Sequence, residues 1–173
     1  MDTVDRDSPG NIDSGQPDGS EDSSGIATVI RALEENSKGR ASITVTRDED
    51  GLHVLAVPSN TAASRIILSF VDERNPRGLV LQAGAESHVC LDTDLRGTDW
   101  TGWRSFLDAA IRAIVAGCFT ETIRYRAGLP IVVEMSLDLD GRRFEFTRTN
   151  VQNWFRSLGG EKASRTIQYA PYS

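Results

Sequence analysis

Eight short stretches of the chain carry apolar residues in alternation with polar ones or in a near-continuous run, and both patterns predict β-strands. The clearest alternation places Ile131, Val133 and Met135 on one face of a strand and Glu134 on the other. Asp140-Gly141 follows this strand, and an Asp-Gly pair between two such stretches predicts a tight hairpin. The predicted strands are 43–47, 52–57, 65–71, 79–83, 88–91, 119–126, 131–139 and 142–148.

Three further stretches repeat apolar residues every three or four positions, and this spacing predicts amphipathic helices. Capping residues and glycines bound these helices at 23–39, 98–117 and 149–160. The second is the longest, with an apolar stripe from Trp103 to Cys118. The third carries Trp154 and Phe155 on the side that we expect to dock on the sheet.

The order helix, five strands, helix, three strands, helix predicts an α+β protein. Short turns between consecutive strands favour antiparallel pairing. We therefore expect a largely antiparallel sheet of about seven to eight strands, with a long central helix and shorter N- and C-terminal helices packed on it. The last dozen residues either add an edge strand near 166–169 or lie loose. The length of 26–173 matches one domain.

The first 25 residues carry all of the net charge of −6, because they hold seven acidic residues and one basic residue. They contain no aromatic residue and are rich in Asp, Ser, Gly and Pro. We predict that 1–25 is a disordered acidic tail. It serves either as a solubilising extension or as a mobile acidic arm that competes for a basic groove.

The remaining 148 residues are neutral, and a neutral domain lacks the basic surface that nucleic-acid binding requires. Residues 150–156 superficially resemble a homeodomain recognition helix in their Trp-Phe pair, but no three-helix unit precedes them. No apolar run is long enough to cross a membrane, and no secretory signal is evident. We expect a cytoplasmic protein that binds neither nucleic acid nor membrane, in which Cys90 and Cys118 are buried free thiols rather than a disulfide.

The residues that usually carry chemistry are few. His53 and His88 are the two histidines, and Cys90 shares a strand face with His88. A thiol beside an imidazole provides a nucleophile with a base, or two metal ligands, but no further ligand follows at a suitable spacing. Asp138 to Glu145 departs from the calcium-loop spacing, and the sequence lacks a phosphate loop. We therefore expect no catalytic residues, no metal and no cofactor.

One strand face and one aromatic residue are the best candidates for binding a partner. Arg124 and Arg126 lie with two threonines on the polar face of 119–126, where Glu134 of the next strand pairs with them or joins the contact surface. Trp100 lies outside the apolar stripe of the central helix, and exposed aromatic residues favour interfaces. We predict that Trp100, Arg124, Arg126 and Glu134 contact another protein.

The shortage of chemical groups favours a non-enzymatic protein-binding domain. The element order is similar to that of small secretion chaperones, with about two more strands, and toxin-immunity proteins are another class of small, motif-poor α+β domains. Either resemblance implies binding to a toxin or a secreted effector, which the protein neutralises or escorts. The alternative is a small-molecule-binding domain or weak enzyme, with a pocket between sheet and central helix lined by Phe70, Met135, Phe144 and Phe146.

Overall fold

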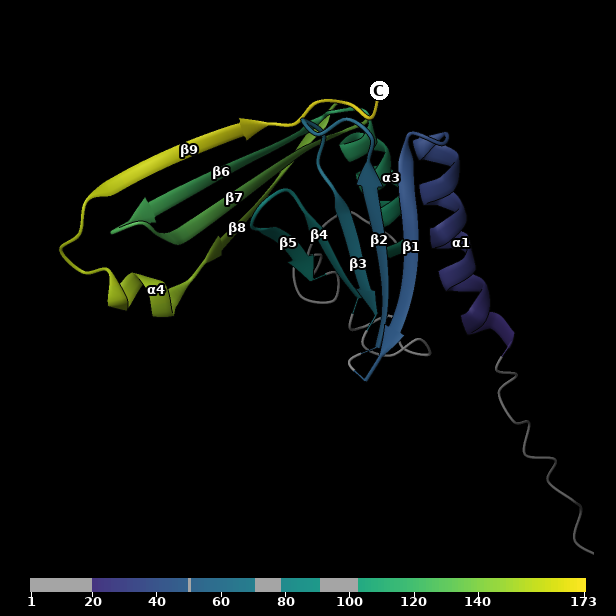
Figure 1. Ribbon diagram of the computed structural model, residues 1–173, viewed down its shortest axis with the longest axis horizontal. Helices are drawn as coiled ribbons and strands as arrows, with labels where there is room; N and C mark the ends of the chain where they lie inside the picture. Colours follow the sequence, from purple (N-terminus) through teal and green to yellow (C-terminus); the bar gives the residue numbers. More distant parts are fainter. Residues whose placement is uncertain (1–19, 50, 71–78, 91–102) are drawn as a thin grey trace, which may run out of the picture.

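The computed structural model describes residues 20–49, 51–70, 79–90 and 103–173. Within these residues the chain forms nine strands and three helices, and the strands belong to two antiparallel sheets of five and four strands (Figure 1). The mixed, largely antiparallel architecture was predicted, but the single sheet of seven to eight strands was wrong.

The first sheet is a meander in which each strand pairs with the next one along the chain. Leu68, at its centre, is fully buried and faces the helices, while Ile67 and Ser69 on the opposite face are half-buried. The sheet thus has one dry face and one partly solvated face. Its strands are β1 (Ala41–Asp48), β2 (Gly51–Pro58), β3 (Ile66–Phe70), β4 (Leu79–Ala83) and β5 (Ser87–Cys90).

The second sheet has the strand order β8-β7-β6-β9 and projects from the first sheet like an arm (Figure 1). Asp140 and Gly141 join β7 to β8 with φ angles of 51° and 78°, as the predicted hairpin requires. The predicted C-terminal edge strand is present, begins earlier than expected and pairs with β6. The strands are β6 (Phe119–Arg126), β7 (Leu129–Leu139), β8 (Arg142–Thr149) and β9 (Lys162–Gln168).

The helices differ from the prediction in length and position. The longest is the N-terminal α1 (Ser20–Ser37), which begins inside the segment expected to be a disordered tail. The central helix α3 (Trp103–Val115) is shorter and packs against α1 and against β7. Its buried stripe ends before Cys118, which is exposed beyond the helix end, contrary to the expected buried thiol.

In the chain, α3 lies between β5, the last strand of the first sheet, and β6, the first strand of the second sheet. After α3 the chain enters the base of the second sheet, where Met135, Leu137 and Leu139 of β7 join the common core. Further along the arm, Ile131 and Val133 are half-buried. The short helix α4 (Val151–Arg156) lies at the far end of this sheet and contacts β7, but none of its residues is buried, so it does not cover the sheet with an apolar face as predicted.

Candidate functional site

A buried carboxylate joins the two sheets. Glu121 belongs to β6 and is fully buried, and its two oxygens accept hydrogen bonds from the turn between β4 and β5. The backbone N–H of Ala85 lies 3.0 Å from Oε2, while the backbone N–H of Glu86 and the Ser87 hydroxyl lie 2.8 and 2.7 Å from Oε1. The Tyr169 hydroxyl completes the set, at 2.8 Å from Oε2. Every donor faces a carboxylate oxygen, so the burial of this charge is compensated.

Two opposing effects set the pKa of Glu121. Burial raises the pKa, but the hydrogen bonds from Ala85, Ser87, Glu86 and Tyr169 outweigh it and hold the pKa below its ordinary value. Tyr169 responds in the opposite sense, because burial and the adjacent Glu121 carboxylate raise its pKa. Glu121 is therefore a structural anion, which the sequence signals by an acidic residue between Phe119 and Ile123 on an apolar face.

A groove separates the edge strand β5 from strands β7 and β8 of the arm. Its larger hollow, of about 500 Å³, continues into a second hollow of about 370 Å³ that reaches the start of α4. Both hollows are lined by Glu86, His88, Val133 and Arg148. We call this the inter-sheet groove; its remaining lining residues are Ser87, Cys90, Pro130, Met135, Glu145, Phe146, Thr147, Thr149, Asn150, Val151 and Gln152.

The sequence predicted a pocket lined by four apolar residues, and the inter-sheet groove contains two of them at a different place in the fold. Met135 and Phe146 line it, as expected for a pocket, but it lies between two sheets rather than between sheet and central helix. Phe70 is buried in the common core and Phe144 packs against that core. Because β5 is an edge strand beside the arm, His88 and Cys90 both come to the groove wall.

Exposed apolar side chains gather at the far end of the arm. Of the seven large apolar residues that are exposed in the described part of the chain, five belong to α4 and the neighbouring segments. Phe155 is 62 % exposed, Leu158 59 % and Val151 57 %. The Trp154 ring packs edge-on against Phe155, with 5.2 Å between ring centroids. This α4 cluster consists of Leu129, Val151, Trp154, Phe155 and Leu158.

The predicted contact residues divide between two places. Arg124 and Glu134 form an ion pair of 2.5 Å on the open face of the arm, so each charge is already matched within the chain. Arg126 instead reaches the α4 cluster, where its guanidinium carbon lies 6.0 Å from the centroid of the Trp154 ring. Its buried Nε has no hydrogen-bond partner among the described residues. Trp100 lies outside the described residues.

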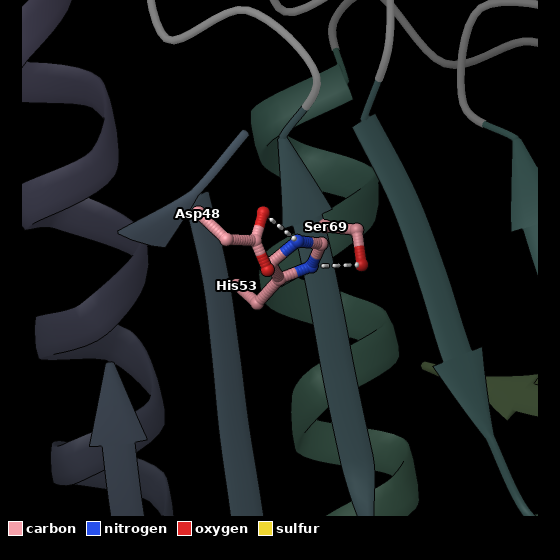
Figure 2. Close-up of polar contacts among 3 residues, drawn as sticks. All are labelled: Asp48, His53 and Ser69. Carbon is pink, nitrogen blue, oxygen red and sulfur yellow. Dashed lines mark hydrogen bonds and ion pairs between the residues drawn. The ribbon is translucent and has the colours of Figure 1, made fainter. Parts of the chain in front are cut away.

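A polar chain on the solvated face of the first sheet joins Asp48, His53 and Ser69 (Figure 2). His53 Nδ1 lies 3.0 Å from Ser69 Oγ, and Nε2 lies 3.3 Å from Asp48 Oδ1. These are the groups of a hydroxyl nucleophile with its base and orienting acid. Ser69, however, sits mid-sheet and pairs with both β2 and β4, so its own backbone N–H is committed to the ladders rather than to an oxyanion. We interpret these two hydrogen bonds as a network between strands that orients the His53 ring.

Neither a search for metal-binding groups nor a comparison with known proteins identifies a further site. No group of three or more His, Cys, Asp or Glu residues suited to a metal occurs in the parts of the chain that the structure describes. No described helix has both the length and the apolar character needed to cross a membrane. No family model matches the chain, and comparisons with curated proteins and with solved structures find no match.

Proposed function

We propose that this chain is a non-enzymatic protein-binding domain and that the α4 cluster is its principal contact surface. The observation that carries the proposal is the exposure of Val151, Trp154 and Phe155 on one short helix that buries none of its residues, with Leu158 exposed just beyond the helix end. A contiguous apolar patch on the surface of a soluble domain typically marks a site of interaction. Trp and Phe are well suited to this role, because large rigid side chains dominate the energy of interfaces.

The charge around the α4 cluster supports an interface with a polar rim. Arg126 borders the Trp154 ring, and Arg156 lies exposed in the last turn of α4. An apolar centre bordered by arginine is typical of protein–protein interfaces. We therefore move the predicted contact surface from Arg124 and Glu134, which pair with each other, to α4 and Arg126.

A partner of the toxin or secreted-effector class fits this proposal. The element order resembles that of secretion chaperones, and immunity proteins are another class of small, motif-poor α+β domains. Such a partner is neutralised or escorted by a stable complex, which requires apolar contacts as well as charge. The proposal therefore names an immunity-type or chaperone-type protein that acts without catalysis.

Quantitative capture of a partner tests the proposal. The tagged full-length chain is incubated with a lysate of the organism that encodes it, and bound protein is quantified by mass spectrometry. We expect one stoichiometric partner, retained by wild type and by Arg124→Ala but reduced at least tenfold by Phe155→Asp. Equal retention by wild type and Phe155→Asp would show that the α4 cluster is not the contact surface.

A second candidate function is the binding of a small molecule in the inter-sheet groove. The observation that favours it is a hollow of about 500 Å³ beside His88, with Met135 and Phe146 on its wall. That volume falls in the range of pockets that hold small ligands. Native mass spectrometry of the purified chain distinguishes the two, because a retained small molecule adds a defined mass that denaturation removes.

A further inference from the structure

Four consecutive residues of β8 line the inter-sheet groove. Glu145, Phe146, Thr147 and Arg148 all belong to the wall of the larger hollow. Side chains alternate between the faces of a strand, so a hollow that covers one face of a sheet touches every second residue. Contact with four residues in a row means that the hollow lies along the edge of β8 and borders its backbone.

The hydrogen-bond pattern identifies which backbone groups face this edge. The Asn150 N–H donates to the carbonyl of Ile131 over 2.9 Å, so this pair belongs to the hydrogen-bonded class of the β7–β8 ladder. Such pairs alternate along an antiparallel ladder, which makes Val133 with Arg148 and Met135 with Phe146 hydrogen-bonded too. The N–H and C=O groups of Glu145 and Thr147 therefore point away from β7.

β8 ends the second sheet, and within the described residues it pairs on one side only. An edge of this kind is a template for another strand, because its outward N–H and C=O groups have a regular spacing. The opposite wall of the groove is β5, the edge strand of the first sheet. A space bounded by two strand edges suits an extended polypeptide better than a compact ligand.

The side chains around the edge define what the added strand must carry. Val133, Met135 and Phe146 form an apolar wall on the inner face of the arm. Glu145 is paired with Arg143 at 3.0 Å, whereas Arg148 has no ion-pair partner within the described residues. Arg148 lines both hollows, so it can form a charge-assisted pair with a carboxylate seated in the groove.

We propose that the inter-sheet groove receives an extended segment of the partner polypeptide, which adds as a strand to the free edge of β8. The segment carries an apolar side chain toward Met135 and Phe146 and an acidic residue beside Arg148. This inference rests on the proposed function and deepens it. The groove continues to Val151 of the α4 cluster, so one partner contacts both surfaces.

The first experiment selects 12-residue peptides from a random phage-displayed library against the full-length protein. Synthetic copies of the selected peptides are then added to the labelled protein, and amide hydrogen exchange is followed by NMR. We expect the Glu145 and Thr147 amides to exchange at least tenfold more slowly in the complex. When single backbone N–H groups of the peptide are methylated one position at a time, binding should be abolished at every second position, because only alternate N–H groups of an added strand face β8.

The inference is overturned if the library yields no binding peptide, or if bound peptides leave the exchange of these β8 amides unchanged.

Thr147→Pro with Thr147→Ala as its matched control separates this inference from the proposed function. Proline removes the outward N–H of an edge strand without removing a ladder bond, while alanine removes the side chain alone. We expect Thr147→Pro to weaken capture of the partner at least tenfold and Thr147→Ala to leave it nearly unchanged. If Phe155→Asp abolishes capture while Thr147→Pro does not, the proposed function stands and the strand addition fails. If Thr147→Pro abolishes capture while Phe155→Asp does not, the α4 contact is contradicted instead. If Thr147→Pro fails to fold, the hydrogen-exchange measurements with the selected peptides test the strand addition.

Discussion

The Ser87 hydroxyl donates a hydrogen bond of 2.7 Å to Glu121 Oε1, and this bond links the last strand of the first sheet to the second sheet. The same carboxylate accepts three more hydrogen bonds, from Ala85, Glu86 and Tyr169. These hydrogen bonds hold the arm to the first sheet in addition to the apolar core. We call Glu121 and its four donors the polar joint.

Replacing Glu121 with glutamine should destabilise the fold although the shape of the side chain is preserved. The amide offers one acceptor oxygen instead of two, so one backbone N–H, that of Ala85 or that of Glu86, faces the new NH2 group and loses its acceptor. A buried donor left unsatisfied costs roughly 1–3 kcal/mol, and we expect a loss of about 2 kcal/mol or more. Urea denaturation measures it. Glu134→Gln, which removes one charge of an exposed ion pair, is the control and should cost about 0–1 kcal/mol.

Glu121 should also make stability depend on pH. Burial alone raises its pKa, but the hydrogen bonds reverse the sign and hold the folded pKa below the ordinary value of 4.5. The unfolded chain therefore binds the proton first on acidification, and stability falls as the pH drops through 4.5 toward the folded pKa. We expect the difference in unfolding free energy between wild type and Glu121→Gln to be constant above about pH 6 and to shrink below it. A difference that is the same at pH 7 and pH 3 contradicts this assignment.

Gly84 is packed against the same carboxylate, and an added methyl group should break the joint. A Cβ at this position would lie 2.9 Å from both Glu121 Oε2 and the Tyr169 hydroxyl oxygen. Gly128 is a matched control, because its φ of 76° resembles the 71° of Gly84 but nothing lies within 4 Å of its Cβ position. Both alanine variants incur the cost of a left-handed backbone, about 1–2 kcal/mol. We expect thermal melting to show Gly84→Ala less stable than Gly128→Ala by about 1–3 kcal/mol.

Exposure of the α4 cluster predicts that it contributes little to folding. Phe155→Ser should change the unfolding free energy by no more than about 0.5 kcal/mol, as is usual for surface positions. Phe106 is fully buried in the core, so Phe106→Ala should cost about 3–5 kcal/mol. Chemical denaturation of both variants checks this contrast. A large loss of stability in Phe155→Ser would mean that the Phe155 side chain is packed in the fold rather than exposed to solvent.

Tyr172 fastens the C-terminal segment to the first sheet, where the sequence left open whether these residues lie loose. Its buried hydroxyl donates a hydrogen bond of 2.6 Å to the carbonyl of Ser64, and burial raises its pKa. Tyr172→Phe leaves that carbonyl without its partner and should cost about 1–2 kcal/mol. Tyr125→Phe, at a half-buried position on the arm, is the control in the same denaturation series and should cost less.

The strands were predictable from the sequence because each one is decided locally. Alternation and the turn residues place β4 and β6 at the observed bounds, and Asp140-Gly141 forms the expected hairpin. The division into two sheets was not predictable, since alternation fixes the faces of a strand and not its neighbour across a helix. β9 pairs with β6 over more than thirty intervening residues, and no local pattern encodes that pairing.

The candidate site was predictable only in part, for a related reason. The apolar spacing of Val151, Trp154 and Phe155 correctly indicates a helix, but the same spacing serves docked and exposed helices alike. The groove arises where β5 meets the arm, so its lining comes from segments that only the tertiary fold brings together. The acidic residue on the apolar face of β6 was a local signal of the joint, because a buried acid needs several partners.

The joint around Glu121 also constrains how the sequence of this protein can change. Glu121 needs its donors, the donors need a carboxylate, and Gly84 must remain without a side chain for the two to meet. A single replacement in this set leaves a buried group unmatched, whereas a concerted replacement need not. Among proteins descended from a common ancestor with this one, Gly84, Ser87, Glu121 and Tyr169 should therefore be inherited or lost as a block.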